Sequence, residues 1–102
     1  MVSEMDEKLI YGKLHIHPIS REVYVDEREI VLTRMEFDVL YFLAYNPNRA
    51  FTKDQIYEAV CKESYADGSY IIRDIIYRLR AKLDISHIHT LHGYGYKFNA
   101  ES

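Results

Sequence analysis

The sequence predicts an α+β fold, in which an antiparallel sheet comes first, three helices follow and a β-hairpin ends the chain. Apolar and polar residues alternate over roughly residues 9–32, which is typical of strands. Apolar residues then recur every three or four positions over residues 33–84, which is typical of helices. Two short strand-like runs flank a glycine-containing turn near the C-terminus. Residues 1–8 are acidic and aperiodic, so we expect a tail or linker remnant before one domain at residues 9–100.

Length and composition are those of a single soluble domain. The chain has 102 residues, of which 48% are hydrophobic and 28% are charged. It contains neither a run of eighteen apolar residues nor the pattern of a secretory signal. Cys61 is its one cysteine, which favours a reducing compartment, so we expect a cytoplasmic protein that does not enter a membrane.

The N-terminal strands are predicted from residues that alternate in polarity. Leu14 and Ile16 share one face of a strand, and His15 and His17 share the other. Similar alternation recurs around residues 23–25 and 30–32, after short polar clusters at residues 18–21 and 26–29. These runs predict an antiparallel meander of three or four strands.

Two capping boxes mark the starts of the first two helices. Residues 33–36 (TRME) and 52–55 (TKDQ) each place a threonine three positions before Glu or Gln. Asn46 precedes Pro47, which ends the first helix, and residues 50–51 form a short extended link. The third helix is expected from about Ser69 to Asp84, with a core-facing stripe made of Ile72, Ile76, Leu79 and Leu83.

The hairpin is predicted at the C-terminal end of the domain. Residues 88–91 and 96–98 form its strands, and residues 92–95 (HGYG) join them. Gly93 and Gly95 are expected to adopt positive φ in this turn. A three-helix core with a terminal hairpin is a winged helix–turn–helix, in which the hairpin is the wing.

The net charge of −3 argues against a polyanionic partner, but the charge is unevenly distributed along the chain. Residues 69–102 carry five basic and three acidic residues, a balance of +2, together with three histidines. The negative charge lies in the first 68 residues. Because the local field acts on an anionic partner, this distribution permits DNA binding without proving it.

Four motifs in order resemble one family. Residues 32–40 (LTRMEFDVL) match its LTxxEFxxL helix, and residues 46–56 (NPNRAFTKDQI) match its NP-containing segment. Residues 78–83 (RLRAKL) match RLRxKL, and residues 90–97 (TLHGYGYK) match TxRGxGY followed by Arg or Lys. Over residues 9–100 the chain therefore resembles the DNA-binding effector domain of OmpR/PhoB-type response regulators.

The resemblance implies both a fold and a function. The fold is a winged helix–turn–helix with a four-stranded N-terminal sheet, three helices and a C-terminal wing. The function is sequence-specific binding of double-stranded DNA to regulate transcription, as a pair on direct-repeat half-sites and downstream of a receiver domain. In this family the loop at residues 65–68 often meets RNA polymerase, although a plain connector is the simpler interpretation.

The third helix is expected to read DNA in the major groove. Arg78 stands where the family places a DNA-contacting arginine, and its guanidinium can donate two hydrogen bonds to guanine. Arg80 and Lys82 are expected to contact phosphates. Lys53 and the free amides at the start of the second helix are further phosphate candidates. The alternative is a solvated cationic face.

The same helix departs from the family pattern at positions that often touch DNA. Asp74 is placed either to accept a hydrogen bond from the N4 amino group of cytosine or to form an ion pair with Arg78, one turn away. Ile71 and Ile75 are open to three interpretations, namely contact with thymine methyl groups, contact with a protein, or burial in the domain's own core. The candidates on this part of the helix are Tyr70, Ile71, Arg73, Asp74 and Ile75.

The wing also departs from the pattern, because His92 replaces an arginine that would enter the minor groove. A histidine gains charge below about pH 6.5, so we expect weak wing contacts that strengthen at lower pH. Tyr94 and Lys97 are the other wing candidates, and Tyr96 is expected in the core.

No motif predicts catalysis or a cofactor. The five histidines lack the cysteine and carboxylate spacing of a closed zinc site, so adventitious binding or none is expected. The chain has no GxSxG, Walker or HExxH motif, and an enzyme is not expected. The alternative to DNA readout is a winged-helix protein-interaction domain with weak DNA affinity.

Overall fold

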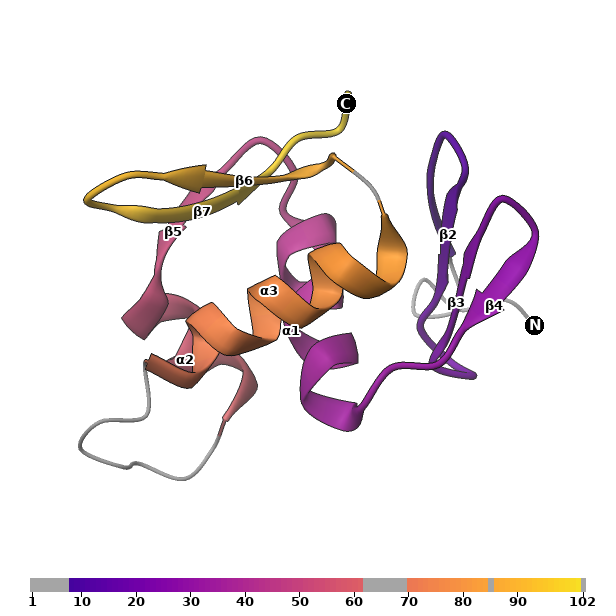
Figure 1. Ribbon diagram of the computed structural model, residues 1–102, viewed down its shortest axis with the longest axis horizontal. Coiled ribbons are helices and arrows are strands. Elements are labelled where there is room, and N and C mark those ends of the chain that lie inside the picture. Colours follow the sequence, from indigo (N-terminus) through magenta and orange to yellow (C-terminus); the bar gives the residue numbers. More distant parts are fainter. Residues whose placement is uncertain (1–7, 62–69, 85, 102) are drawn as a thin grey trace.

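The computed structural model describes residues 8–61, 70–84 and 86–101. The predicted order of elements is confirmed, and the helices lie between an N-terminal sheet and a C-terminal sheet (Figure 1). The N-terminal sheet consists of β1 (Leu9–Tyr11), β2 (Leu14–His17), β3 (Glu22–Val25) and β4 (Arg28–Ile30). The other elements are α1 (Arg34–Tyr45), β5 (Ala50–Thr52), α2 (Lys53–Val60), α3 (Tyr70–Leu83), β6 (Ile88–Leu91) and β7 (Gly95–Phe98).

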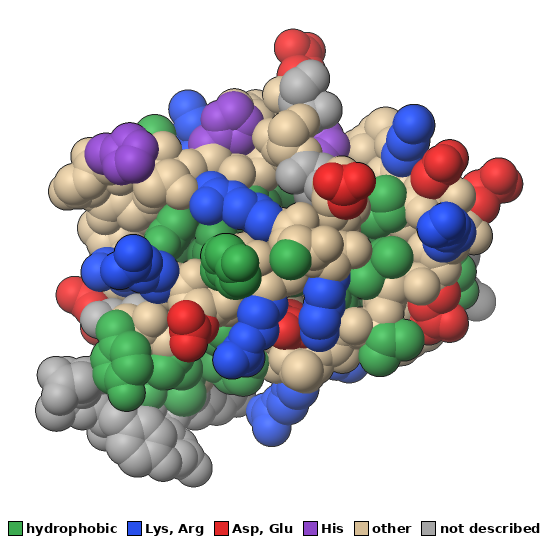
Figure 2. Space-filling model, viewed as in Figure 1, with side chains coloured by type: hydrophobic (Ala, Val, Ile, Leu, Met, Phe, Trp, Pro, Cys, Tyr) green, Lys and Arg blue, Asp and Glu red, His purple; other side chains and the backbone are tan. Residues whose placement is uncertain are grey.

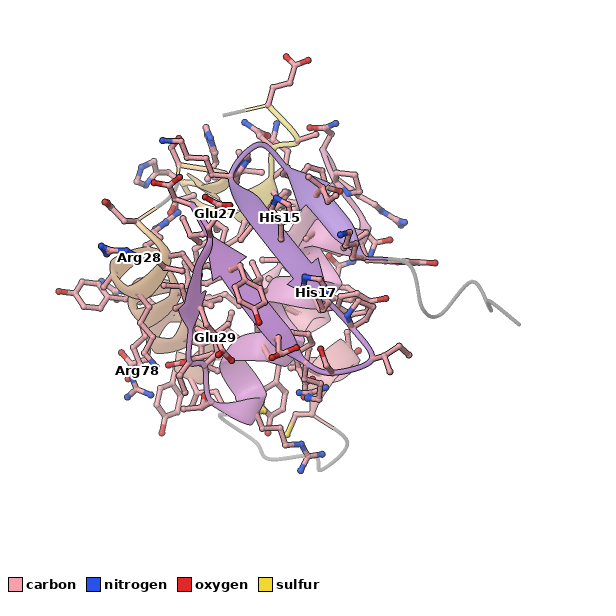
Figure 3. All side chains as sticks on the ribbon, turned by 90° about the vertical axis from the view of Figure 1, so that its right-hand side faces the viewer. His15, His17, Glu27, Arg28, Glu29 and Arg78 are labelled. Carbon is pink, nitrogen blue, oxygen red and sulfur yellow. The ribbon has the colours of Figure 1, made fainter. Side chains whose placement is uncertain are left out.

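The N-terminal sheet is an antiparallel meander with strand order β1-β2-β3-β4. Ile16 pairs with Val23, and both side chains point into the core, as does Leu14. His15 and His17 alternate with them and point away from the helices on the opposite face (Figure 3). The predicted period of two is confirmed.

Both predicted capping boxes form. The Thr33 amide donates to Glu36 Oε1 at 2.9 Å, and the Glu36 amide donates back to Thr33 Oγ1 at 3.2 Å. Thr52 and Gln55 make the same exchange at 2.8 and 3.1 Å. These bonds satisfy amides that the first turns of α1 and α2 would leave unpaired.

The wing is the β6–β7 hairpin, which belongs to a three-stranded sheet with order β5-β7-β6. Residues 50–51, expected as an extended link, belong to β5, which pairs antiparallel with β7. Gly93 has a φ of 79°, as predicted for the turn. The prediction for Gly95 was wrong, because its φ is not positive. Gly95 is required because an added Cβ would lie 1.9 Å from the Phe51 carbonyl oxygen of β5.

One core joins the three helices to both sheets. The predicted stripe of α3 is buried in it, and so are the inner residues of the N-terminal sheet and β7. Its fully buried larger hydrophobic side chains are Leu14, Ile16, Val23, Leu40, Leu43, Ile56, Ile72, Ile76, Leu79, Leu83 and Phe98. Within the described ranges, no helix is long and apolar enough to cross a membrane.

Candidate nucleic-acid interface

Helix α3 lies across the front of the molecule, between the wing and the N-terminal sheet (Figure 1). One side of it packs into the core, and the other is open to solvent. Tyr77 and Tyr70 are the exposed large hydrophobic side chains of α3, at 75% and 66%. Figure 2 shows the same face, where Lys and Arg side chains are interspersed with hydrophobic ones, and histidines gather over the wing.

Helical geometry orders the exposed side chains of α3. Successive residues are turned by about 100°, so four of them fall opposite the buried stripe. We call Tyr70, Asp74, Tyr77 and Ala81 the outer stripe of α3. Arg73 lies beside this stripe on the wing side, and Arg78 lies beside it on the opposite side.

A cleft of about 590 Å³ separates α3 from the wing. It brings together Lys53 at the start of α2, Arg73 on α3, and His92 and Tyr94 on the wing, all predicted as site residues. Tyr77 also lines it. The full lining is Lys53, Arg73, Ile76, Tyr77, Arg80, Thr90, Leu91, His92, Gly93, Tyr94, Gly95 and Tyr96.

Arg80 forms hydrogen bonds within the domain, and its predicted contact with phosphate stays a prediction. Its Nε and Nη2 donate to the Ile88 carbonyl oxygen at 3.2 and 3.0 Å, and Nη2 also donates to Thr90 Oγ1 at 2.8 Å. Its guanidinium lies 5.9 Å from the centre of the Tyr96 ring. Arg80 therefore ties α3 to strand β6 and fixes one wall of the cleft.

Lys82 likewise forms an ion pair within the domain, and its predicted contact with phosphate stays a prediction. Its Nζ lies 2.6 Å from Oε1 of Glu36, whose side chain is 1% exposed. Burial by itself would raise the pKa of Glu36. The hydrogen bonds from Lys82 and the Thr33 amide outweigh burial and lower that pKa below its ordinary value. The carboxylate therefore stays charged, and Lys82 balances it.

Ile75 belongs to the core, which was one of the interpretations left open for it. Its side chain is 5% exposed, because it points toward the side of α3 that packs against the other helices. Ile71, one turn earlier, is half-buried and packs against the same core. Of the three interpretations considered for these residues, the core is the one that the structure supports.

Asp74 and Arg78 are both exposed, but the predicted ion pair between them does not form. In the described part of the chain, ion pairs join Arg21 and Arg34 to Asp38, and Lys82 to Glu36. The Arg78 side chain instead extends from α3 into solvent, well apart from His15 and His17 on the outer face of the sheet (Figure 3).

The predicted wing residues differ in accessibility. His92 and Tyr94 stand on the tip of the wing, where Tyr94 is 53% exposed. Lys97 is half-buried on β7, between Ala50 and His89 of the neighbouring strands. Tyr96 is buried, as expected. The loop at residues 65–68 lies outside the described residues.

The site residues predicted from the sequence include Tyr70 but omit Tyr77, which is exposed and lines the cleft. The predicted residues Ile71, Ile75 and Lys82 lie outside the observed outer stripe. The spacing of seven between Tyr70 and Tyr77 was the available signal, since such residues share a helix face. Across the described ranges, no three His, Cys, Asp or Glu side chains gather in a way that could hold a metal ion.

Comparisons with known proteins agree with this geometry. The family model described as "Transcriptional regulatory protein, C terminal" matches residues 27–98. The transcriptional regulatory protein VxrB of Vibrio cholerae is 38% identical over 95 residues, which cover 93% of this chain and 39% of VxrB. The uncharacterized transcriptional regulatory protein YcbL of Bacillus subtilis is 42% identical over 102 residues, covering 90% of this chain and 45% of YcbL.

Two solved structures are similar over nearly their whole length. The RstA DNA-binding domain of Klebsiella pneumoniae, solved in complex with the RstA box, has a TM-score of 0.83 at 25% identity and covers 93% of this chain and 99% of its own. The CpxR DNA-binding domain of E. coli has a TM-score of 0.82 at 25% identity, covering 94% and 99%. The chain spans only 39% and 45% of the curated relatives VxrB and YcbL. It belongs to the family of transcriptional regulatory protein C-terminal domains, as a winged-helix effector domain of the OmpR/PhoB type.

Proposed function

We propose that this domain binds double-stranded DNA sequence-specifically and is the transcription-regulating effector domain of a two-component response regulator. Helix α3 enters the major groove and the wing reaches toward the adjacent minor groove. The observation that carries the proposal is the cleft between α3 and the wing, which gathers Lys53, Arg73 and His92.

The cleft suits one DNA strand. In this docking the sugar–phosphate backbone that separates the two grooves runs between α3 and the wing. Lys53 and Arg73 are exposed and stand on the α2 and α3 sides of that path, while His92 stands on the wing side. Cationic side chains placed in this way position a protein on DNA through phosphate contacts.

Arg78 lies on the side of α3 that faces away from the cleft. Its exposed side chain lies beside the outer stripe, away from the cleft, where it reaches a guanine edge or the phosphates of the opposite strand. Its free guanidinium contrasts with that of Arg80, which holds β6. The proposal therefore uses Arg78 for DNA and Arg80 for the shape of the site.

The net negative charge is compatible with this role. The exposed acidic residues Asp26, Glu27 and Glu29 surround the β3–β4 turn. Figure 3 shows Glu27 and Glu29 on the N-terminal sheet, whereas Arg78 belongs to α3. The acidic β3–β4 turn thus lies at the opposite end of the molecule from the wing (Figure 1).

The wing supplies a pH-dependent part of the affinity. His92 is exposed and lines the cleft, so protonation adds a positive charge beside the DNA strand. Binding to a fixed duplex should strengthen from pH 8 to pH 6 in the parent, and less in His92→Ala. An equal pH response in the two proteins would contradict this role.

The partners proposed from the family extend beyond this domain. They are a receiver domain upstream, a second copy on direct-repeat DNA and, through residues 65–68, RNA polymerase. The length of the relatives supports the first of these, since this chain covers 39% of VxrB and 45% of YcbL. A cytoplasmic location suits a DNA-binding regulator with one cysteine.

The competing function is protein recognition by the same face with weak DNA affinity. The observation that favours it is the exposure of Tyr70 and Tyr77, because tyrosine is enriched at protein interfaces. This alternative function predicts that DNA binding is weak and unselective, and that substitution of Arg78 does not change it.

Selection from a random duplex pool separates the two functions. The parent domain, Arg78→Ala and Arg28→Ala are each taken through selection and then titrated with the enriched duplex across a salt series. Arg28 is an equally charged, exposed residue on the N-terminal sheet and is the matched control (Figure 3). We expect an enriched motif, a log–log salt slope of several units, and a loss of affinity in Arg78→Ala alone. No enrichment, or equal binding by all three proteins, would contradict the proposal.

A further inference from the structure

The outer stripe of α3 contains no cation, although it is the line of side chains most directly opposite the core. Its residues are Tyr70, Asp74, Tyr77 and Ala81, and each is exposed. The nearest free cations, Arg73 and Arg78, flank the stripe on its two sides. Tyrosine and aspartate therefore occupy the centre of the face, and arginine occupies its margins.

This arrangement implies that the centre of the exposed face of α3 and its two margins contact different parts of a DNA duplex. A helix in the major groove directs its central line at base edges, while the two phosphate backbones pass along its sides. Arg73 and Arg78 stand where phosphates run. Tyr70, Asp74 and Tyr77 stand where base edges are exposed.

Asp74 limits which base can lie opposite it. A carboxylate accepts hydrogen bonds and cannot donate one. Among the described side chains, none forms an ion pair or hydrogen bond with Asp74, so its oxygens are available to a ligand. Cytosine presents an amino donor in the major groove, whereas adenine places an acceptor beside its donor and guanine presents two acceptors. Cytosine is therefore the base that a carboxylate fits best.

The two tyrosines favour thymine beside that cytosine. Tyr70 and Tyr77 lie one turn on either side of Asp74, and both rings are largely exposed. Aromatic rings make apolar contact with the thymine methyl group, which no other base carries in the major groove. A tyrosine cannot make the bidentate pair by which arginine selects guanine.

We propose that α3 reads pyrimidines at the centre of its site, with Asp74 accepting from the N4 amino group of cytosine and Tyr70 and Tyr77 contacting flanking thymine methyl groups. Arg73 and Arg78 hold the two backbones. This inference rests on the proposed DNA-binding function and specifies the base class that the same face recognises.

Asp74→Asn gives the sharpest test, because it changes the hydrogen-bonding code without changing the size of the side chain. Asparagine pairs bidentately with adenine. The motif selected by the variant should therefore have adenine at one position where the parent motif has cytosine. Parent binding to its own motif should exceed that of the variant by about fivefold or more. The control Arg28→Ala should select the parent motif.

Modified DNA tests the tyrosines separately. Uracil in place of thymine removes only the C5 methyl group. This change should lower the DNA affinity of the parent domain by about threefold. A Tyr70→Ala and Tyr77→Ala double variant should bind the thymine and uracil duplexes equally. These residues are exposed, so thermal unfolding should show that the variants remain folded.

The outcomes distinguish this inference from the function beneath it. A guanine-centred motif that Asp74→Asn keeps and Arg78→Ala loses would overturn pyrimidine readout while leaving DNA binding intact. Equal parent binding to the uracil and thymine duplexes would overturn the role of the tyrosines. Failure of the parent to enrich any motif would overturn the proposed function itself.

Discussion

Lys82 and Glu36 form an ion pair of 2.6 Å that joins the last turn of α3 to the first turn of α1. The carboxylate is buried at 1% exposure, while the Lys82 side chain is 38% exposed. Glu36 also caps α1 by accepting from the Thr33 amide. One buried carboxylate thus sets the start of α1 and the position of α3, which presents the outer stripe.

Removing the Lys82 charge should destabilise the domain. Lys82→Met keeps the aliphatic stem but leaves Glu36 with no cation, so the free energy of unfolding should fall by about 1–3 kcal/mol. Urea unfolding at pH 7 measures this change. Lys13→Met, an exposed turn residue, is the control and should change it by less than about 0.5 kcal/mol. Equal losses in both variants would contradict the structural role of the pair.

The same pair should give stability a defined pH dependence. The pKa of Glu36 in the folded state lies below its ordinary value of 4.5, because hydrogen bonds from Lys82 and Thr33 outweigh its burial. A depressed carboxyl pKa contributes stability above about pH 4.5, and this contribution is lost as pH falls through the folded-state value. The unfolding free energies of the parent and Glu36→Gln should therefore converge below pH 4.5. A difference that stays constant from pH 7 to pH 3 would contradict the shift.

Arg80 should control the wing rather than supply a free DNA contact. Arg80→Met removes the bonds to Ile88 and Thr90, so amides of β6 and β7 should exchange with solvent about tenfold faster. Hydrogen exchange with residue resolution measures this effect. Arg78→Met is the matched control and should leave wing exchange unchanged, since its side chain extends into solvent. Unchanged wing exchange in Arg80→Met would show that this anchor is dispensable.

Gly95 and Gly93 should respond differently to substitution. Gly95→Ala drives a methyl group into the Phe51 carbonyl of β5, so it should separate β5 from β7 and cost about 3 kcal/mol or more. Gly93 has positive φ with open space around it, so Gly93→Asn should cost less than about 1 kcal/mol. Thermal unfolding of both variants tests the contrast. A Gly95→Ala domain as stable as the parent would contradict the close approach.

The sequence predicted the elements well because each carried a local signal. Threonine followed three residues later by Glu36 or Gln55 marked the helix starts, and both capping boxes formed. Alternation around Leu14 and Ile16 marked the N-terminal sheet. The pairing of β5 with β7 was missed, because it joins segments about forty-five residues apart and leaves no periodic signal in either.

The site was harder to predict, because charge in a sequence does not reveal where a side chain is used. Arg80 and Lys82 carry the expected charge, but their partners at Ile88 and Glu36 lie on other elements and have no motif that links them to α3. The place of Ile75 stayed open, because the buried side of α3 is wider than the four-residue stripe that the spacing suggested. The solvent-facing position of Tyr77 followed from helical geometry once the buried side was known.

Backbone-amide chemical-shift mapping with a selected duplex tests the central claim most directly. DNA bound by the proposed face should shift the amides of residues 53–55, 70–78 and 92–94. The outer face of the N-terminal sheet, where His15 and Tyr24 lie, should remain unchanged. Shifts concentrated on that sheet, or saturation without any shift in α3 and the wing, would contradict the account.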